Sequence, residues 1–149
     1  MKLGFITAIL ENYTYEQMME FASVEGFECV EVACWPAGDA ERRYAGVSHI
    51  DIGKVLEDNT YAEYIGNLSR AKGVEISSLA YYPNILDADQ AKALACREHL
   101  RKVIMASAKL GVGMVTTFIG RDQTKTVEEN LEIVRMVWPE LLELAGANG

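Results

Sequence analysis

Polar side chains that could bind a small polar ligand follow an apolar stretch late in the sequence. Residues 114–119 read as a buried strand that breaks at Gly120 into a cation and an anion, Arg121 and Asp122. A guanidinium donates hydrogen bonds in a fork, which suits a phosphate or a sugar oxygen. The alternative is a surface ion pair, or an aspartate turn that leads into a helix capped by Thr126.

Two other short motifs carry residue types that bind sugars. His49, which is followed closely by Asp51, could orient a sugar hydroxyl or carry a proton near neutral pH, or the two could form a turn and a helix cap. Tyr81 and Tyr82 could stack on a sugar face, and Asn84 could hydrogen-bond its hydroxyls. Because side chains alternate along a strand, one of the two tyrosines is expected to pack in the core.

Three more residues are ambiguous from the sequence. Trp35 ends another apolar stretch and could wall a pocket, although core packing is the better-supported role. Glu31 could point into a barrel interior, where a carboxylate needs a partner such as Lys2. His99 is expected on a solvated face of a helix that is rich in basic residues.

A strand, a loop with polar groups and an amphipathic helix recur four times along the chain. Strands are expected at residues 2–7, 29–35, 74–82 and 114–120, and helices near 15–26, 56–68, 89–110 and 126–145. Capping boxes are expected at Thr14 with Gln17, at Asp87 with Gln90 and at Thr126 with Glu129. Pro139 is expected to kink the last helix or to split it.

This alternation predicts an α/β fold with parallel strands joined by right-handed crossovers. The loop after the first strand contains no glycine, so the phosphate fingerprint of a doubly wound sheet is missing, and a (β/α)8 TIM barrel is favoured. A complete barrel needs eight such units. Residues 1–149 are therefore expected to form one (βα)4 half-barrel domain, completed by dimerisation or by a C-terminal half-barrel.

Composition narrows the range of partners. The chain has 149 residues and a formal net charge of −8, which argues against a nucleic-acid partner. No stretch of 18 apolar residues is present, so no membrane association is expected. No secretory signal is visible, which predicts a cytoplasmic protein whose three cysteines are free thiols.

Six stretches of the chain together resemble a known family. They are "KLGFIT", "GFECVEVACWP", "GVSHIDI", "EISSLAYYPNILD", "HLRKVIMASAKLGV" and "TTFIGRDQTKTVEENL". The set is similar to the N-terminal half of xylose-isomerase-like TIM barrels, in particular to sugar phosphate isomerases and epimerases. The resemblance implies one divalent metal, manganese, magnesium or cobalt, bound by Glu, Asp and His from strands five to eight. In such enzymes acidic residues move a proton between adjacent carbons through an enediolate that the metal stabilises.

No position of this sequence matches those metal ligands, so no cofactor is expected in this chain alone. The resemblance therefore implies a chain that contributes the substrate-facing rim of a sugar or sugar-phosphate isomerase or epimerase, without its metal site. The alternative is a catalytically inactive half-barrel that associates with itself. A relation to the DNA-repair endonucleases of the same superfamily is disfavoured by the net charge of −8.

Overall fold

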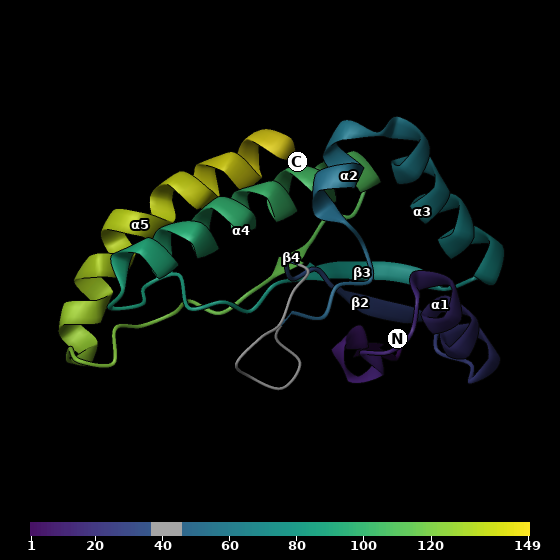
Figure 1. Ribbon diagram of the computed structural model, residues 1–149, viewed down its shortest axis with the longest axis horizontal. Coiled ribbons are helices and arrows are strands. Elements are labelled where there is room, and N and C mark those ends of the chain that lie inside the picture. Colours follow the sequence, from purple (N-terminus) through teal and green to yellow (C-terminus); the bar gives the residue numbers. More distant parts are fainter. Residues whose placement is uncertain (37–45) are drawn as a thin grey trace.

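Four parallel strands form one sheet in chain order in the computed structural model, which describes residues 1–36 and 46–149 (Figure 1). The strands are β1 (Gly4–Ile6), β2 (Cys29–Ala33), β3 (Glu75–Ala80) and β4 (Val115–Thr116). The helices are η1 (Thr7–Leu10), α1 (Tyr15–Val24), α2 (Ile52–Glu57), α3 (Asn59–Lys72), α4 (Gln90–Leu110) and α5 (Val127–Asn148). The sheet and its crossovers confirm an α/β fold with the architecture of half a TIM barrel.

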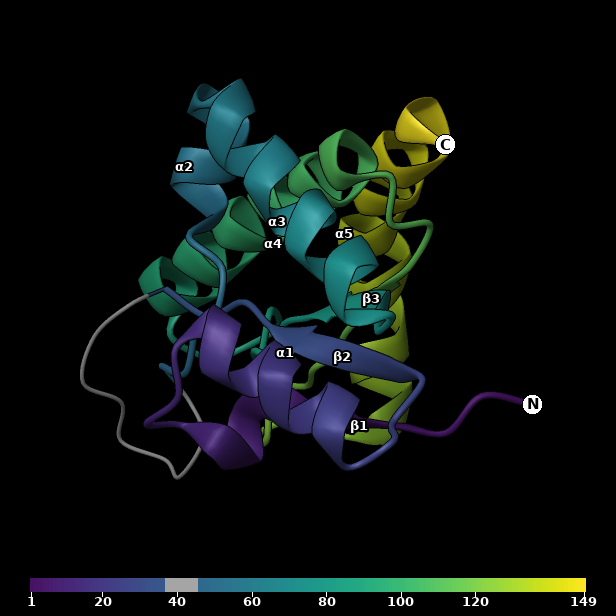
Figure 2. The same cartoon turned by 90° about the vertical axis from the view of Figure 1, so that its right-hand side faces the viewer.

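The hydrophobic core lies between the two central strands and the helices that cover them (Figure 2). Val30, Val32 and Leu79 are fully buried on the side of the sheet that packs against Met18 of α1 and Leu100 of α4. Each such side chain contributes about 1.5–3 kcal/mol by leaving water. The burial of alternate strand residues fixes which side chains are left for the opposite, concave face of the sheet.

Two of the three expected helix caps are present. The boxes of Thr14 with Gln17 and of Thr126 with Glu129 each form both reciprocal hydrogen bonds. The third expectation is wrong, because α4 is capped by Asp89, which accepts from two backbone N–H groups of the first turn. Asp87 instead accepts from the backbone N–H of Asp89 at 3.1 Å and so shapes the loop before the helix.

The helical part of the second unit is divided where one helix was expected. Asp58 separates α2 from α3 because its carboxylate accepts from the backbone N–H groups of Thr60 and Tyr61, at 2.8 and 3.2 Å. Helix α5, in contrast, is not split and continues past Pro139. A proline deletes one backbone hydrogen bond, which the remainder of a 22-residue helix can outweigh.

The fourth strand is shorter than the apolar stretch that predicts it. β4 pairs only with β3, in the register Leu79 to Val115 and Ala80 to Thr116. Because β3 ends at Ala80, residues 117–120 have no strand beside them and form a loop. The loop brings its polar residues next to those that follow β3.

Two expectations from composition have a structural counterpart. Cys29, Cys34 and Cys96 are free thiols, as predicted. Over residues 1–36 and 46–149, the helices are too short or too polar to cross a membrane.

Candidate functional site

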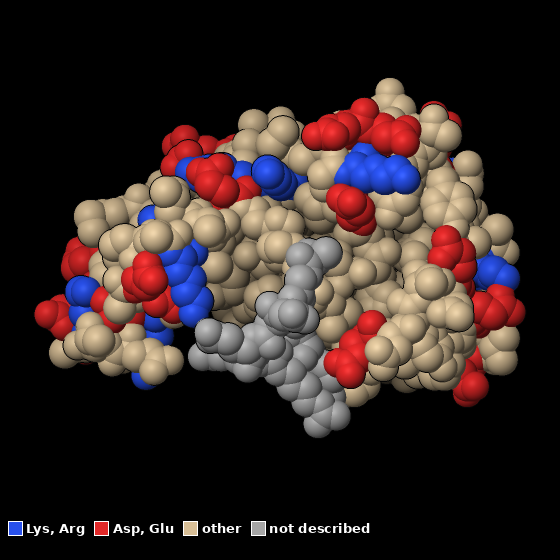
Figure 3. Space-filling model, in the orientation of Figure 1, with Lys and Arg blue, Asp and Glu red and all other residues tan. Residues whose placement is uncertain are grey.

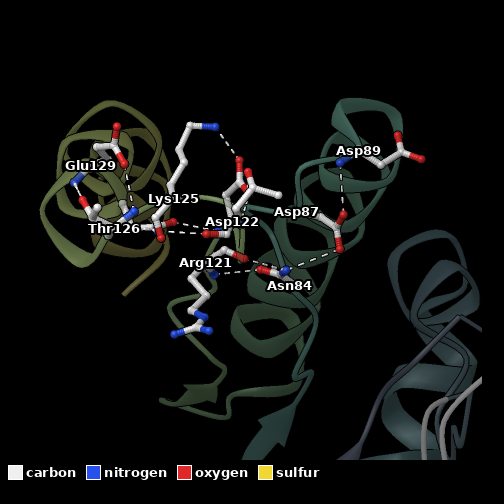
Figure 4. Close-up of polar contacts among 10 residues, drawn as sticks. Asn84, Asp87, Asp89, Arg121, Asp122, Lys125, Thr126 and Glu129 are labelled. Atoms are coloured by element: carbon white, nitrogen blue, oxygen red, sulfur yellow. Dashed lines mark hydrogen bonds and ion pairs between the residues drawn. The ribbon is translucent and has the colours of Figure 1, made fainter.

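The loops that follow β3 and β4 are joined by one asparagine side chain. The Asn84 amide donates to the carbonyl oxygen of Arg121, and the Arg121 N–H donates to Asn84 Oδ1. Both hydrogen bonds have a donor–acceptor distance of 2.8 Å (Figure 4). Gly120 adopts φ 78° at this point, a left-handed conformation that glycine accepts without strain. These contacts hold the backbone of Arg121, so its position does not depend on any contact of its side chain.

The guanidinium of Arg121 is exposed and points away from Asn84 and Asp122 in Figure 4. Its charged group makes no ion pair with any residue in the described ranges. Arg121 therefore presents a planar cation, which can donate several hydrogen bonds, on a backbone that is held in place.

The side chain of Asp122, the neighbour of Arg121, points back toward residues of its own loop. Its buried carboxylate binds the Lys125 ammonium and accepts from the N–H and hydroxyl of Thr124, at 2.9 and 2.6 Å. The hydrogen bond from Lys125, followed by those from Thr124, lowers the pKa of Asp122 to about 2. These partners occupy the carboxylate, so the structure places Asp122 as the organiser of the loop that carries Arg121.

Asn130 completes that loop and was not identified from the sequence. Its Oδ1 accepts from the Asp122 N–H at 2.7 Å, and its Nδ2 donates to the Asp122 carbonyl at 3.0 Å. The side chain is buried near the start of α5. The sequence contained one indication of this role: Asn130 is a polar residue four positions after the Thr126 cap, on the face of the helix that otherwise carries apolar side chains.

A row of polar groups crosses the concave face of the sheet. The Ser78 hydroxyl donates to Glu31 Oε2 at 2.9 Å, and the Tyr82 hydroxyl donates to Glu31 Oε1. Burial, followed by the hydrogen bond to Glu31, raises the pKa of Tyr82. Lys2, the partner considered for Glu31, is bound to Glu75 instead, at the opposite end of the strands.

Tyr82 also forms an aromatic pair with Phe118, which the sequence did not single out. The two ring centres lie 4.8 Å apart and the rings are tilted by 45°. Phe118 is 62% exposed. The exposed Phe118 ring beside the half-buried Tyr82 provides an aromatic surface, next to hydroxyl and carboxylate groups, on which the apolar face of a sugar ring can lie.

Tyr81 and Trp35 lie behind this surface. Tyr81 is buried, with its ring centre 4.9 Å from that of Trp35 and 4.6 Å from that of His99. The prediction that one of the two adjacent tyrosines packs in the core is thus confirmed for Tyr81. Trp35 is half-buried against it, so its ring supports the end of β2.

His99 corrects the sequence-based expectation of a solvated residue. Its Nε2 lies 2.8 Å from the carbonyl oxygen of Cys34, and its ring is half-buried against Tyr81. The reason is helical phase: residue 99 lies beside Leu100 on the side of α4 that approaches the sheet. Burial lowers the pKa of His99, so the neutral ring is favoured.

His49 is held by hydrogen bonds at both ring nitrogens. Thr7 Oγ1 accepts from the Ala33 N–H at 2.9 Å, which leaves its hydroxyl proton for His49 Nδ1 at 3.1 Å. Nε2 then donates to the Leu10 carbonyl at 3.1 Å. Burial lowers the pKa of His49. Asp51, two residues on, caps α2 by accepting from the Lys54 N–H at 2.9 Å.

From the lowered pKa values of His49 and His99 we predict that the free energy of unfolding decreases in mild acid. Folding lowers both pKa values below 6.5, so below about pH 6.5 the unfolded chain binds more protons than the folded protein. Their contribution to the free energy of unfolding is complete above that pH and decreases as the pH falls. Urea midpoints between pH 5 and 8 should show this slope, and His49→Gln should reduce it. An unchanged slope in both His49→Gln and His99→Gln would contradict the assignment.

The structure therefore divides the predicted site residues into two groups. All of them lie in the rim, by which we mean the loops at the carboxyl ends of the strands. The Arg121 guanidinium is exposed and the Tyr82 ring is half-buried, whereas the other residues have their polar atoms or rings engaged by the protein itself: Trp35, His49, Tyr81, Asn84 and Asp122. On the face drawn in Figure 3, acidic and basic side chains are interspersed and no continuous basic track crosses the coloured surface.

Comparison with known proteins supports this reading of the fold. The family described as xylose isomerase-like TIM barrel matches residues 19–149, which is most of the chain. The chain belongs to this family. No curated protein is similar enough in sequence to be matched to it.

Solved structures of several proteins share the fold at low sequence identity. A putative xylose isomerase from Rhodospirillum rubrum matches with a TM-score of 0.72 and 19% sequence identity. D-psicose 3-epimerase from Clostridium cellulolyticum, crystallised with D-tagatose, matches with a TM-score of 0.69 and 16% identity. The IolI protein, solved with a bound zinc atom, matches with a TM-score of 0.63 and 20% identity. The match covers 100% of this chain and 51%, 50% and 49% of those chains. The chain thus spans about half the length of each.

The metal site that the resemblance implies has no counterpart in the described residues. The zinc in IolI shows that at least one structural relative binds a metal. In residues 1–36 and 46–149 of this chain, no three His, Cys, Asp or Glu side chains come together as a ligand set. Glu31, the carboxylate on the concave face, is held by Ser78 and Tyr82. The described residues do not by themselves fit a divalent metal.

Proposed function

We propose that this chain supplies the substrate-facing rim of a sugar or sugar-phosphate isomerase or epimerase. The single observation that carries the proposal is the placement of Arg121. Its backbone is locked to Asn84 on both sides, while its guanidinium is exposed and unpaired within the described residues. Membership of the xylose isomerase-like family supports a sugar as the ligand class.

In this proposal the rim binds and orients the substrate. Arg121 donates to a phosphate or to a sugar oxygen, and the exposed ring of Phe118 beside Tyr82 receives the apolar face of the sugar. The Tyr82 hydroxyl, held by Glu31, sets the polar border of that surface. The acidic groups that move a proton between adjacent carbons come from a second half-barrel, so full activity requires one.

Binding of a ketose phosphate tests the role of Arg121. We expect Arg121→Ala to weaken the binding of D-fructose 6-phosphate by about tenfold or more, the worth of one charge-assisted contact, and that of D-fructose by less. Arg70→Ala, which removes an exposed arginine on α3, is the matched control. NMR shift titration at constant ionic strength measures both affinities. Equal effects of the two substitutions would contradict the proposal.

A second candidate function is a catalytically inactive half-barrel that associates with itself. It is compatible with the lack of a carboxylate and imidazole cluster in the described residues. Binding of D-fructose 6-phosphate to the purified chain distinguishes the two, because a purely structural half-barrel predicts no binding that Arg121→Ala weakens.

A further inference from the structure

Tyr82 has a fixed hydrogen-bonding polarity because a carboxylate takes its only hydroxyl proton. The Tyr82 hydroxyl donates to Glu31 Oε1, and the Ser78 hydroxyl donates to the other oxygen, Oε2, at 2.9 Å. A carboxylate accepts hydrogen bonds and donates none, and a phenol has a single proton to donate. Once that proton is directed at Glu31, the phenolic oxygen can only accept a hydrogen bond from a ligand.

The register of the sheet builds this arrangement into the concave face. Glu31 on β2 is paired with Ser78 on β3. Ser78 and Tyr82 are four residues apart, so an extended chain places both side chains on one side, and both donate to Glu31. The Tyr81 N–H still donates to the Thr116 carbonyl at 3.0 Å, so the backbone next to Tyr82 continues in line with β4. The tyrosine is therefore held at both its backbone and its hydroxyl.

The two hydroxyls that donate to Glu31 differ in how far a ligand can reach them. Ser78 is 2% exposed, so its hydroxyl serves the protein alone. The hydrogen bond from Tyr82 to Glu31 is only partly buried, and the exposed ring of Phe118 lies 4.8 Å from the Tyr82 ring, centre to centre. A sugar that lies on Phe118 would meet the phenolic oxygen and the Glu31 carboxylate, which are both acceptors.

The titration of Tyr82 has the direction that this geometry requires. Burial, followed by the hydrogen bond to Glu31, raises the pKa of Tyr82. The Thr116 hydroxyl lowers the same pKa, as a donor to the phenolic oxygen does. Tyr82 therefore keeps its proton at neutral pH, and its oxygen is already used as an acceptor within the protein.

We propose that Glu31 is a positioning residue that makes Tyr82 an acceptor for a sugar hydroxyl and thereby orients the ligand on the rim. The exposed guanidinium of Arg121 can only donate, so it takes a phosphate or another oxygen acceptor. The acceptor pair of Tyr82 and Glu31 disfavours such groups and selects a hydroxyl that donates. The ligand class is therefore a polyhydroxylated molecule that carries a separate anionic or carbonyl group. The inference rests on the proposed function, because it orients the same ligand at the same site.

An NMR shift titration of the intact chain tests the two ends of the site separately. Tyr82→Phe keeps the ring and removes only the oxygen. D-fructose and D-fructose 6-phosphate should each bind about two- to tenfold more weakly to this variant, the worth of one neutral hydrogen bond, and inorganic phosphate should bind as it does to the wild-type chain. Tyr64→Phe is the matched control, because the Tyr64 hydroxyl also donates to a glutamate, Glu16, but between helices α3 and α1.

The outcomes distinguish this inference from the proposed function. Unchanged affinity of Tyr82→Phe for both sugars, together with weaker binding of D-fructose 6-phosphate to Arg121→Ala, would overturn the inference and leave the proposed function in place. Equal effects of Tyr82→Phe and Tyr64→Phe would also overturn it. Absence of sugar binding by the wild-type chain would contradict the proposed function and, with it, the role of Tyr82 as an acceptor.

The role of Glu31 can be measured without a ligand, by NMR titration of the ring carbon that bears the Tyr82 hydroxyl. In Glu31→Gln the pKa of Tyr82 should fall, because the charged acceptor is lost. In Ser78→Ala, which removes the other donor to the same carboxylate, that pKa should stay raised. The same Tyr82 pKa in Glu31→Gln and in the wild-type chain would overturn the proposal. The ligand titration of Tyr82→Phe does not require that Glu31→Gln folds.

Discussion

Gly120→Ala should lower the free energy of unfolding by about 2–4 kcal/mol, through two effects that act at the same atom. The residue has φ 78°, where a Cβ costs about 1–2 kcal/mol. That Cβ would also lie 2.9 Å from Asn84 Oδ1 and 3.2 Å from the backbone nitrogens of Ile85 and Leu86. The neighbours are backbone and a side chain that is already hydrogen-bonded, so they cannot easily move away.

Gly26→Ala provides a control that separates the two effects. Gly26 has φ 79°, almost the same conformation, but nothing lies within 4 Å of its Cβ position. Its substitution should cost only about 1–2 kcal/mol, the conformational part. Urea denaturation of both variants measures the difference. If the two cost the same, the close contact between the loops after β3 and β4 is not present in solution.

Local signals in the sequence predicted the parts of the fold that depend on neighbouring residues. The capping boxes at Thr14 and Thr126 were identified because both partners lie within four residues of each other. The choice of Asp89 over Asp87 as the cap of α4 was not, because two local carboxylates compete there and the structure uses Asp87 to accept from the Asp89 N–H. The length of β4 likewise depends on where its neighbour β3 ends.

The same distinction applies to the candidate site. Arg121 and Asn84 were selected as polar residues after strands, and strand order alone brings their loops together. Their backbone contact could not be foreseen, nor could the engagement of Asp122 by its own loop. His99 was misjudged because helix spacing does not tell which side of α4 meets the sheet when that side also carries polar residues.

Asn130→Ala should lower the free energy of unfolding by about 2–3 kcal/mol because it leaves the buried Asp122 N–H without its acceptor and removes two further hydrogen bonds. That acceptor lies at 2.7 Å, and the Asp122 and Thr126 carbonyls lose side-chain donors at 3.0 and 2.8 Å, although each keeps a backbone donor. Asn67→Ala is the control: Asn67 is exposed on α3 and receives one hydrogen bond from Arg70 at 2.6 Å, so its loss should cost less than about 0.5 kcal/mol.

The effect of Asn130→Ala on ligand binding connects the loop to the proposed site. If Asn130 holds the loop and Arg121 binds the ligand, the variant should weaken the binding of D-fructose 6-phosphate although Asn130 itself is buried. Amide exchange should increase at residues 120–125 and stay unchanged in β2 and β3, because those strands make no contact with the Asn130 amide. A large loss of stability with unchanged affinity would mean that Arg121 is positioned by Asn84 alone, since the hydrogen bonds between their loops remain in this variant.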